Sequence, residues 1–347
     1  MIRGLQLPWK QPVGYFLTSG PMGHGTLTEK VKEAITLVQN TGLKVRVMVC
    51  DQGSNNQAML KTLGISHTKP YFSLNGQKVI CIFDPPHLIK NIRNNLKKTG
   101  FVVNGKDISW SYISEAYHQD CQSGRFRMLH KLSHKHIEIP PFKSMSVHLA
   151  TQVLSHTMFC TIGTMIHHKC MDEDALPTAD FVKQFDTLFD ICNSKCQDTK
   201  FFRLPIPLTG NIAATEQIKE LASLDAWLSS VKSKGSGVPA CLLGWRVTIA
   251  GICELATDLS KEDGWRFLMT RRLNQDALEN FFAIIRGKNG FMDNPDPRQF
   301  RAAYRACVMD RLHHLSPGSN CEEDGDSLLI QVNVHLCHTC RMICKKY

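Results

Sequence analysis

Acidic residues that directly follow apolar, strand-like segments are the part of this sequence best suited to chemistry. Asp51 follows KVRVMVC, and Asp84 follows KVICIF. A carboxylate at the carboxyl end of a parallel strand lies where α/β folds place their ligands. Asp276 and Glu279 share one face of an expected helix. Carboxylates from separate elements are what phosphoryl transfer with two divalent ions requires, and Mg²⁺ favours such ligands.

The same acids also have a purely structural interpretation. Asp51 could cap the helix that follows it, and Asp84 could begin a turn before Pro85. Aspartate is a preferred residue at both kinds of position, because its side chain accepts hydrogen bonds from nearby backbone N–H groups. Spacing alone does not decide between a structural and a catalytic role.

The first hundred residues alternate strand and helix patterns. We expect strands where β-branched and aromatic residues are concentrated, and helices where apolar residues recur every three or four positions. This order predicts an α/β layer with parallel pairing. The expected strands are residues 12–17, 44–50 and 78–83, and the expected helices are residues 26–39, 56–63 and 86–98.

From about residue 110 the pattern becomes helical, with no convincing strand alternation before residue 230. This predicts an all-α block inserted after the α/β start. Residues 232–237, KSKGSG, have the composition of a flexible connector, and residues 316–326 are acidic and rich in Gly and Ser, which predicts disorder. The expected helices are residues 146–168, 180–192, 215–232, 242–256 and 275–286.

The composition predicts a folded, basic protein. The chain has 347 residues, 43% of them hydrophobic and 21% charged, enough for one large or two ordinary domains. The net charge of +10 suits nucleic acid or an anionic membrane. The apolar runs are strand-length, so no membrane span or membrane partner is expected, and the start is not a secretory signal. The 14 cysteines are scattered, which indicates reduced, buried thiols of a cytosolic or nuclear protein.

Several segments carry a family resemblance. They are VCDQGSNNQAMLKTLGI at residues 49–65, FDPPHLIKNIRNNL at 83–96 and LNQDALENFFAIIRGKNG at 273–290. In content and order they resemble the P-element transposases and the related THAP-domain transposases. WKQPVGYFL at residues 9–17 also looks like that family. The resemblance covers roughly residues 9–300, and the segment at 273–290 is the most specific.

The resemblance implies an RNase H-like catalytic core, split by a helical insertion domain that binds GTP. The expected fold is therefore an α/β, RNase H-like mixed sheet with a large all-α insertion, in agreement with the helical block found from periodicity. The expected divisions are an N-terminal part of the core at residues 1–105, the insertion at 110–260, the C-terminal part of the core at 265–312 and a disordered tail at 316–347.

The resemblance also implies an acidic triad that holds two Mg²⁺ ions. Asp51 takes the second position and Glu279 the last, and both are expected to be metal ligands. The first acid belongs on a strand expected upstream of residue 9, and MIRGLQLP contains no Asp or Glu. We therefore expect the chain to be impaired in catalysis. Asp84 is ranked third, as a supporting residue or as the second acid under a different alignment.

For GTP, the resemblance implies a site in the insertion. In FDICN, Asp190 and Asn193 are expected to read the guanine, since a carboxylate accepts from its N1–H and 2-amino groups. No GxxxxGK[ST] sequence is present, so the site is not a P-loop. Without the resemblance, Asp190 is an ordinary solvated helix residue. A second lysine of the family falls on Ser146. The other expected contacts are Lys131 (to phosphate), Val147, Ser155 and Asp276.

Basic residues flank both acidic segments. They fit a DNA backbone held near metal ions, although a solvated charged face explains each group equally well when it is taken singly. The resemblance implies transposon ends and target DNA as partners, a nuclear location and a homo-oligomer formed through regions outside this chain. A Cys/His-rich tail matches no standard zinc spacing. The basic residues are Lys90, Arg93, Lys97, Lys98, Arg271, Arg272, Arg286 and Lys288, and the tail residues are His335, Cys337, His338, Cys340 and Cys344.

Three hypotheses remain open. The first is the core of a cut-and-paste DNA transposase, which nicks DNA and transfers strands with Mg²⁺ under regulation by GTP. The second is a domesticated protein that binds GTP, DNA or partner proteins without chemistry. The third is a gene fragment with no stable function. The catalytic hypothesis requires that Asp51 and Glu279 converge in space although they lie far apart in the sequence.

Overall fold

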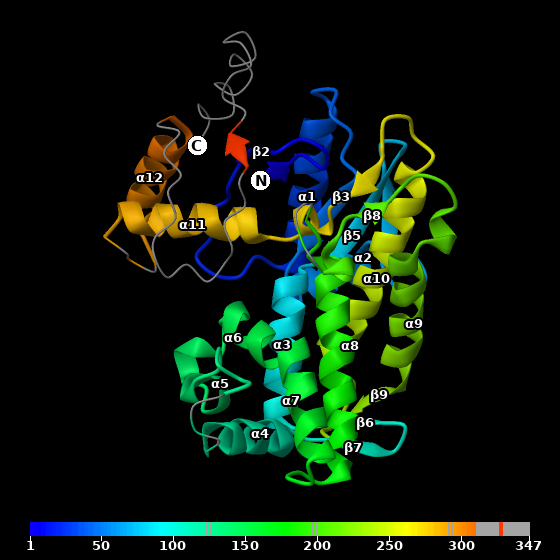
Figure 1. The fold of residues 1–347 in the computed structure, drawn as a ribbon. Coiled ribbons are helices and arrows are strands. Elements are labelled where there is room, and N and C mark those ends of the chain that lie inside the picture. The colour runs from blue at the N-terminus through cyan, green and yellow to red at the C-terminus, as the bar shows by residue number, and fades with distance from the viewer. Residues whose placement is uncertain are drawn as a thin grey trace. The chain divides into compact units, whose positions relative to one another are not determined.

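The computed structural model describes residues 1–309 except 123, 125, 126, 196, 197, 199, 291 and 293, together with residues 326–328. The chain divides into two compact units. One combines Met1–Leu17 with Asp276–Tyr347, and the other is Thr18–Gln275. Figure 1 labels most of the elements of both units. The Cys/His-rich tail lies outside the described residues.

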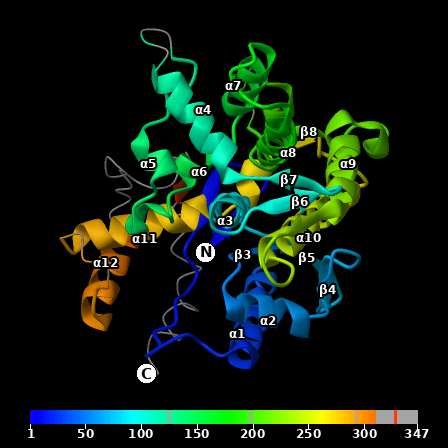
Figure 2. The same ribbon diagram turned by 90° about the horizontal axis from the view of Figure 1, so that it is seen from below.

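A three-stranded sheet forms the α/β layer of the larger unit. Its elements are α1 (His24–Gln39), β3 (Val47–Cys50), α2 (Ser54–Thr62), β4 (Tyr71–Leu74) and β5 (Gln77–Phe83). The strand order is β3-β5-β4, with β3 parallel and β4 antiparallel to β5. Parallel strands need a crossover, which α2 supplies, and α1 packs beside α2 (Figure 2). Asn75 and Gly76 both have positive φ, as the tight β4–β5 turn requires.

The central strand β5 is covered by α10 (Ala240–Leu259), a helix from a distant part of the sequence. Val79, Ile80 and Cys81 of β5 are almost fully buried. The ammonium of Lys78 lies 2.7 Å from a carboxylate oxygen of Asp258 and ties one end of β5 to α10. Sequence analysis found no apolar run of membrane-spanning length, but α10 has the length and composition to cross a membrane. It is mostly buried, as the core helix of a folded unit is.

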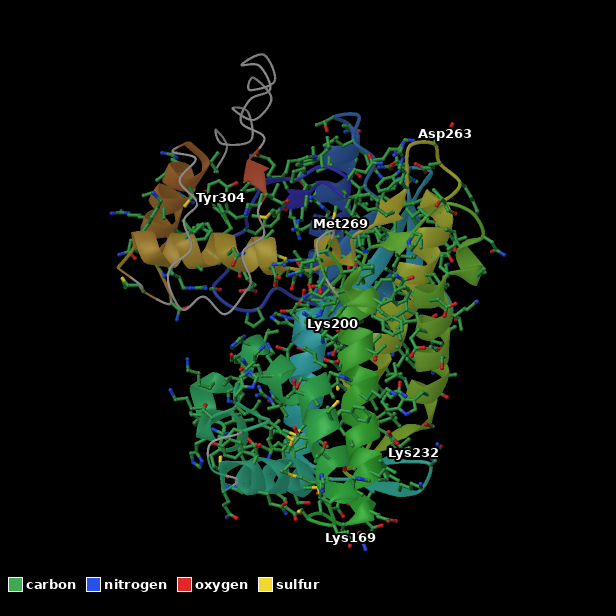
Figure 3. All side chains as sticks on the ribbon, viewed as in Figure 1. Lys169, Lys200, Lys232, Asp263, Met269 and Tyr304 are labelled. Atoms are coloured by element: carbon green, nitrogen blue, oxygen red, sulfur yellow. The ribbon has the colours of Figure 1, made fainter. Side chains whose placement is uncertain are left out.

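The expected helical block is present. It follows α3 (Pro85–Lys98), and its helices, besides α10, are α4 (Trp110–Gln122), α5 (His134–Ile137), α6 (Val147–Val153), α7 (His156–His167), α8 (Leu176–Cys192) and α9 (Glu216–Ser230). Phe181 and Phe185 of α8 centre its core: Phe181 stacks on Phe101, and Phe185 meets Trp227 and Trp245. Figure 3 shows Lys169 and Lys200 at opposite ends of α8. The aromatic cluster therefore joins α8 to α9, α10 and the strand that contains Phe101.

Two small sheets flank the helices of this block. β6 (Phe101–Val103) pairs with β7 (Lys106–Ile108) and with β9 (Val231–Ser233), so the chain leaves and returns at neighbouring strands. The expected connector at 232–237 therefore begins inside a strand. β8 (Ile206–Pro207) pairs with β10 (Phe267–Leu268). Short 3₁₀ turns occupy Pro141–Lys143, Glu173–Ala175, Phe201–Arg203, Ile212–Ala214 and Thr270–Leu273.

The described residues of the smaller unit form two helices and a small sheet. Its elements are β1 (Ile2–Arg3), β2 (Trp9–Gln11), α11 (Asp276–Lys288), α12 (Pro297–Met309) and β11 (Ser327–Leu328). The strand order is β1-β2-β11, so residues 326–328 differ from the expectation of disorder for 316–347. The expected strand at 12–17 is wrong: β2 ends at Gln11, directly before a proline that has no N–H to donate. Beyond it, the Tyr15 ring packs on Phe300 and Tyr304 of α12.

Gly251 sets how closely α10 can approach β5. A Cβ at this position would lie 2.9 Å from the carbonyl oxygen of Cys81, which is backbone and cannot easily move. Gly251→Ala should therefore lower the free energy of unfolding by about 1–3 kcal/mol, as overpacking does. Urea titration followed by circular dichroism measures this. Gly163→Ala on α7 is the matched control, because that site has open space and should gain up to about 1 kcal/mol. Equal effects at the two glycines would contradict the packing argument.

Candidate active site and nucleotide site

Asp51 and Asp84 follow paired residues of two neighbouring parallel strands. Cys50 is opposite Phe83 in the register of β3 and β5, and the N–H of Asp84 donates to the carbonyl of Cys50 at 2.9 Å. The carboxyl ends of these strands therefore bring the two acids to one edge of the sheet, as expected from the sequence.

One oxygen of Asp51 is fixed and the other remains available. Its Oδ1 accepts from the N–H of Gly53 at 2.8 Å and from the amide of Asn56 at 2.6 Å. Within the described part of the chain, Oδ2 accepts no hydrogen bond, and the side chain is half-buried. The N-cap of α2 is Gly53, so Asp51 is not the capping residue itself. A carboxylate held in this way fits the needs of a hard cation, which binds carboxylate oxygens.

Asp84 has a different environment. It is 2% exposed and caps α3, because its Oδ2 accepts from the N–H of His87 at 3.0 Å. Its Oδ1 accepts from the N–H of Gln275 at 2.7 Å. Both oxygens are thus used in hydrogen bonds to the backbone. Asp84 caps a helix and does not begin a turn, but its observed role is a structural one.

The surroundings of these acids are poorly solvated. Burial, together with the nearby charge of Lys90, lowers the pKa of His87 to about 4, while Asp51 acts in the opposite direction. Burial raises the pKa of the Cys50 thiol, and Cys81 and the carboxylates of Asp51 and Asp84 add to that shift. His87 is therefore neutral at physiological pH, and Cys50 remains a thiol.

Glu279 lies in the first turn of α11, in the smaller unit, together with Asp276. Glu279 is half-buried and Asp276 is 8% exposed. Across the described residues, no group of three or more His, Cys, Asp or Glu side chains is gathered as for a metal ion. The convergence of Glu279 with Asp51, and of Asp276 with the nucleotide site, stays a prediction.

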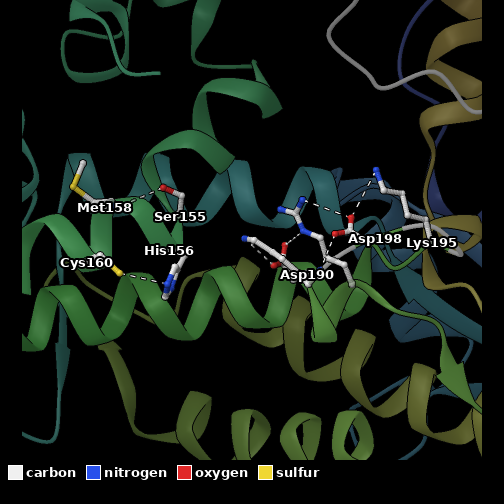
Figure 4. Close-up of polar contacts among 9 residues, drawn as sticks. Ser155, His156, Met158, Cys160, Asp190, Lys195 and Asp198 are labelled. Atoms are coloured by element: carbon white, nitrogen blue, oxygen red, sulfur yellow. Dashed lines mark hydrogen bonds and ion pairs between the residues drawn. The ribbon is translucent and has the colours of Figure 1, made fainter. Parts of the chain in front are cut away.

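At the end of α8, Asp190 is not the solvated helix residue of the alternative interpretation. It is 5% exposed, and its carboxylate accepts from Arg203 Nε at 2.6 Å and faces Lys200 Nζ at 3.5 Å (Figure 4). One turn earlier, burial and the charge of Asp190 raise the pKa of Asp186. Asn193 has a buried Oδ1 with no hydrogen-bond partner among the described residues. An unsatisfied acceptor beside an ion-paired carboxylate suits a ligand that carries N–H donors.

The other expected nucleotide contacts lie at helix starts and in a turn. Ser155 caps α7, accepting from the N–H of Met158 at 3.3 Å and donating to the carbonyl of Gln152 at 2.9 Å. Val147 is the first residue of α6 and is half-buried. Lys131 is exposed and forms no ion pair with a described residue. Ser146, where the family has a lysine, caps α6 through its hydroxyl.

The sequence analysis missed Lys200 and Arg203, the two cations that pair with Asp190. It was also wrong about the exposure of two basic residues of α3. Lys90 and Arg93 are 4% and 0% exposed, so they do not form an open surface for DNA. Arg93 Nη2 donates to the carbonyl of Ser144 at 2.9 Å, and Asn94 donates to the same atom. The sequence signal that could have indicated the burial of Arg93 was its position beside Ile92, on the apolar side of the helix.

Comparison with known proteins identifies relatives over most of the chain. Three family models match: the TNP-like RNase H N-terminal domain over residues 1–64, the TNP-like GTP-binding insertion domain over 86–205, and the TNP-like RNase H C-terminal domain over 272–305. The transposable element P transposase of Drosophila melanogaster is 31% identical over 312 residues, 89% of this chain and 40% of that protein. This chain thus spans less than half the length of that relative.

A solved structure is also similar. It is a Drosophila P element transposase strand transfer complex, with a TM-score of 0.79, 30% identity, and coverage of 89% of this chain and 69% of that one. The expected α/β, RNase H-like fold with a helical insertion is confirmed by this match and by the family models.

Removal of the two strand-end carboxylates should have different effects on stability. Asp84→Ala leaves the N–H groups of the half-buried residues His87 and Gln275 without this acceptor and should lower the free energy of unfolding by about 2–4 kcal/mol. Asp51→Ala loses contacts at a half-exposed turn and should cost about 1 kcal/mol or less. Urea titrations of both variants measure the difference. A loss at Asp51 as large as that at Asp84 would contradict the assignment of Asp84 as the structural acid.

Proposed function

Because the chain belongs to the P-element-type transposases, we propose that it nicks DNA and transfers DNA strands in a reaction that requires Mg²⁺ and is regulated by GTP. The observation that carries the proposal is the geometry of Asp51: its carboxylate is oriented at a strand end, and its Oδ2 accepts no hydrogen bond from a described residue. The matched RNase H and GTP-binding regions support it. We extend the proposal to a nuclear location and to transposon ends and target DNA as substrates.

Asp51 and Glu279 would hold the divalent ion, which supplies charge neutralisation at the scissile phosphate and an activated attacking oxygen. The residues around Asp51 orient its carboxylate, because Gly53 and Asn56 fix one oxygen. Asp84 supports the same edge of the sheet by holding the start of α3. His87, neutral near pH 7, adds no positive charge to this edge, so it does not compete with a cation.

A nicking assay tests the catalytic part. DNA with terminal-repeat sequence is incubated with the whole chain and Mg²⁺ or Mn²⁺. Asp51→Asn and Glu279→Gln should each lower the rate by about 100-fold or more, since a metal contributes several kcal/mol to the transition state. Glu33→Gln, at an exposed position of α1, is the matched control and should leave the rate unchanged. Rates in the Asp51 and Glu279 variants equal to that of the unmodified chain would overturn the proposed site.

For the nucleotide, we propose that Asp190 and Asn193 bind the guanine edge, with Lys131 near the phosphates and Val147 and Ser155 beside them. In this arrangement the N–H groups of guanine would share the Asp190 carboxylate with Arg203 and satisfy the buried oxygen of Asn193.

Titration with fluorescent GTP tests this site. Asp190→Ala and Asp190→Asn should each weaken GTP binding at least about tenfold, because both remove a charged acceptor of two hydrogen bonds. Asp180→Asn, on the same helix and exposed, is the matched control. Equal affinities in all the proteins would remove Asp190 from the nucleotide site. GTP binding without any nicking would favour the second function, a domesticated binding protein derived from a transposase.

A further inference from the structure

The exposed face of α12 carries three arginines and no acidic residue. Arg298, Arg301 and Arg305 stand at positions i, i+3 and i+7 of the helix PRQFRAAYRACVM. With 3.6 residues per turn, they fall within about 60° of one another, so they form one row. All three residues are exposed, and their side chains form no ion pair or hydrogen bond with any residue that the structure describes. We call these residues the arginine row.

The opposite face of α12 fixes the direction in which the arginine row points. Ala303 and Cys307 are buried in the core cluster that also contains Phe281 and Ile285 of α11. The rings of Phe281 and Tyr304 lie 5.7 Å apart between centroids. This packing holds the helix in one rotation, so the arginines cannot turn into the core.

An aligned row of unpaired cations suits a partner with regularly spaced negative charge. Over seven residues of helix the row extends about 10 Å, and duplex DNA presents a phosphate about every 3.4 Å along each strand. The row therefore spans about three phosphate spacings along one strand, enough for each arginine to reach a separate phosphate. Guanidinium groups bind phosphate through two parallel hydrogen bonds, which favours arginine over lysine in this role.

We propose that the arginine row binds the phosphodiester backbone of duplex DNA. The proposal rests on the proposed function and deepens it by assigning a surface to the DNA partner. The row lies in the same compact unit as Glu279, and α12 packs on the helix that carries this residue. Contacts of this kind hold DNA in position without reading its sequence.

Binding of the whole chain to a duplex of arbitrary sequence, measured by fluorescence anisotropy at several salt concentrations, tests the proposal. The triple variant Arg298→Gln, Arg301→Gln, Arg305→Gln should bind at least about tenfold more weakly at low salt. The slope of log affinity against log salt should fall by about 2.7, or about 0.9 for each lost phosphate contact. The triple Arg→Lys variant should keep most of the slope, because it keeps the charges.

A second triple variant separates the arginine row from net charge. Lys32→Gln, Lys44→Gln and Lys61→Gln remove the same charge from exposed positions of the larger unit and should leave the slope unchanged. A wild-type slope in the arginine variant, or equal losses in both glutamine variants, would overturn the proposal while leaving the proposed function in place. Absence of DNA binding by the unmodified chain would overturn both. Circular dichroism checks that each variant is folded.

Discussion

The buried carboxylate of Asp84 holds together the edge of the sheet where the candidate chemistry lies. It ends β5, begins α3 and accepts from the N–H of Gln275, the residue before α11. The junction of β5 with α3 and the distant residue Gln275 therefore share one charged acceptor. Because a buried carboxylate must have its hydrogen bonds made within the protein, this arrangement constrains the backbone at both places. Asp51, at the end of the neighbouring strand, does not hold these segments together, and its Oδ2 can serve as a metal ligand.

The helical insertion can interrupt the chain without separating the parts on either side of it, because the two ends of the insertion lie on neighbouring strands. The chain leaves through β6 and returns through β9, which are hydrogen-bonded neighbours, and α10 then lies on β5. The aromatic cluster around Phe185 links α8 to α9 and α10. The position of the end of α8, where we propose that the guanine binds, thus depends on apolar packing, while the charge of Asp190 at this end is balanced by its ion pair with Arg203.

The periodic patterns predicted most elements of the larger unit. They failed where the backbone leaves a helix or strand although the apolar spacing continues. The apolar spacing over residues 146–168 predicts one helix, but the chain forms α6 and α7. Leu154 leaves the helical conformation, with ψ at 69°, and the Ser155 hydroxyl caps a new helix. Serine before a helical segment is a start signal that the apolar spacing masked. Conversely, the apolar segment at 12–17 suggested a strand, but it forms none with the residues that the structure describes.

The sequence by itself determined the order of the elements, the carboxylates at the strand ends and the family resemblance. These features depend on residue types and on short spacings, and both can be read within a single segment of the chain. Only the tertiary structure decided which charged groups are buried and which face solvent. Lys90 and Arg93 carry the positive charge expected of a DNA-binding face, yet both are buried, and Arg93 donates to the carbonyl of Ser144 in the loop before α6. The arginines of α12 are exposed. The physical reason is that burial depends on what a helix packs against, and contacts between distant segments leave no period in the sequence.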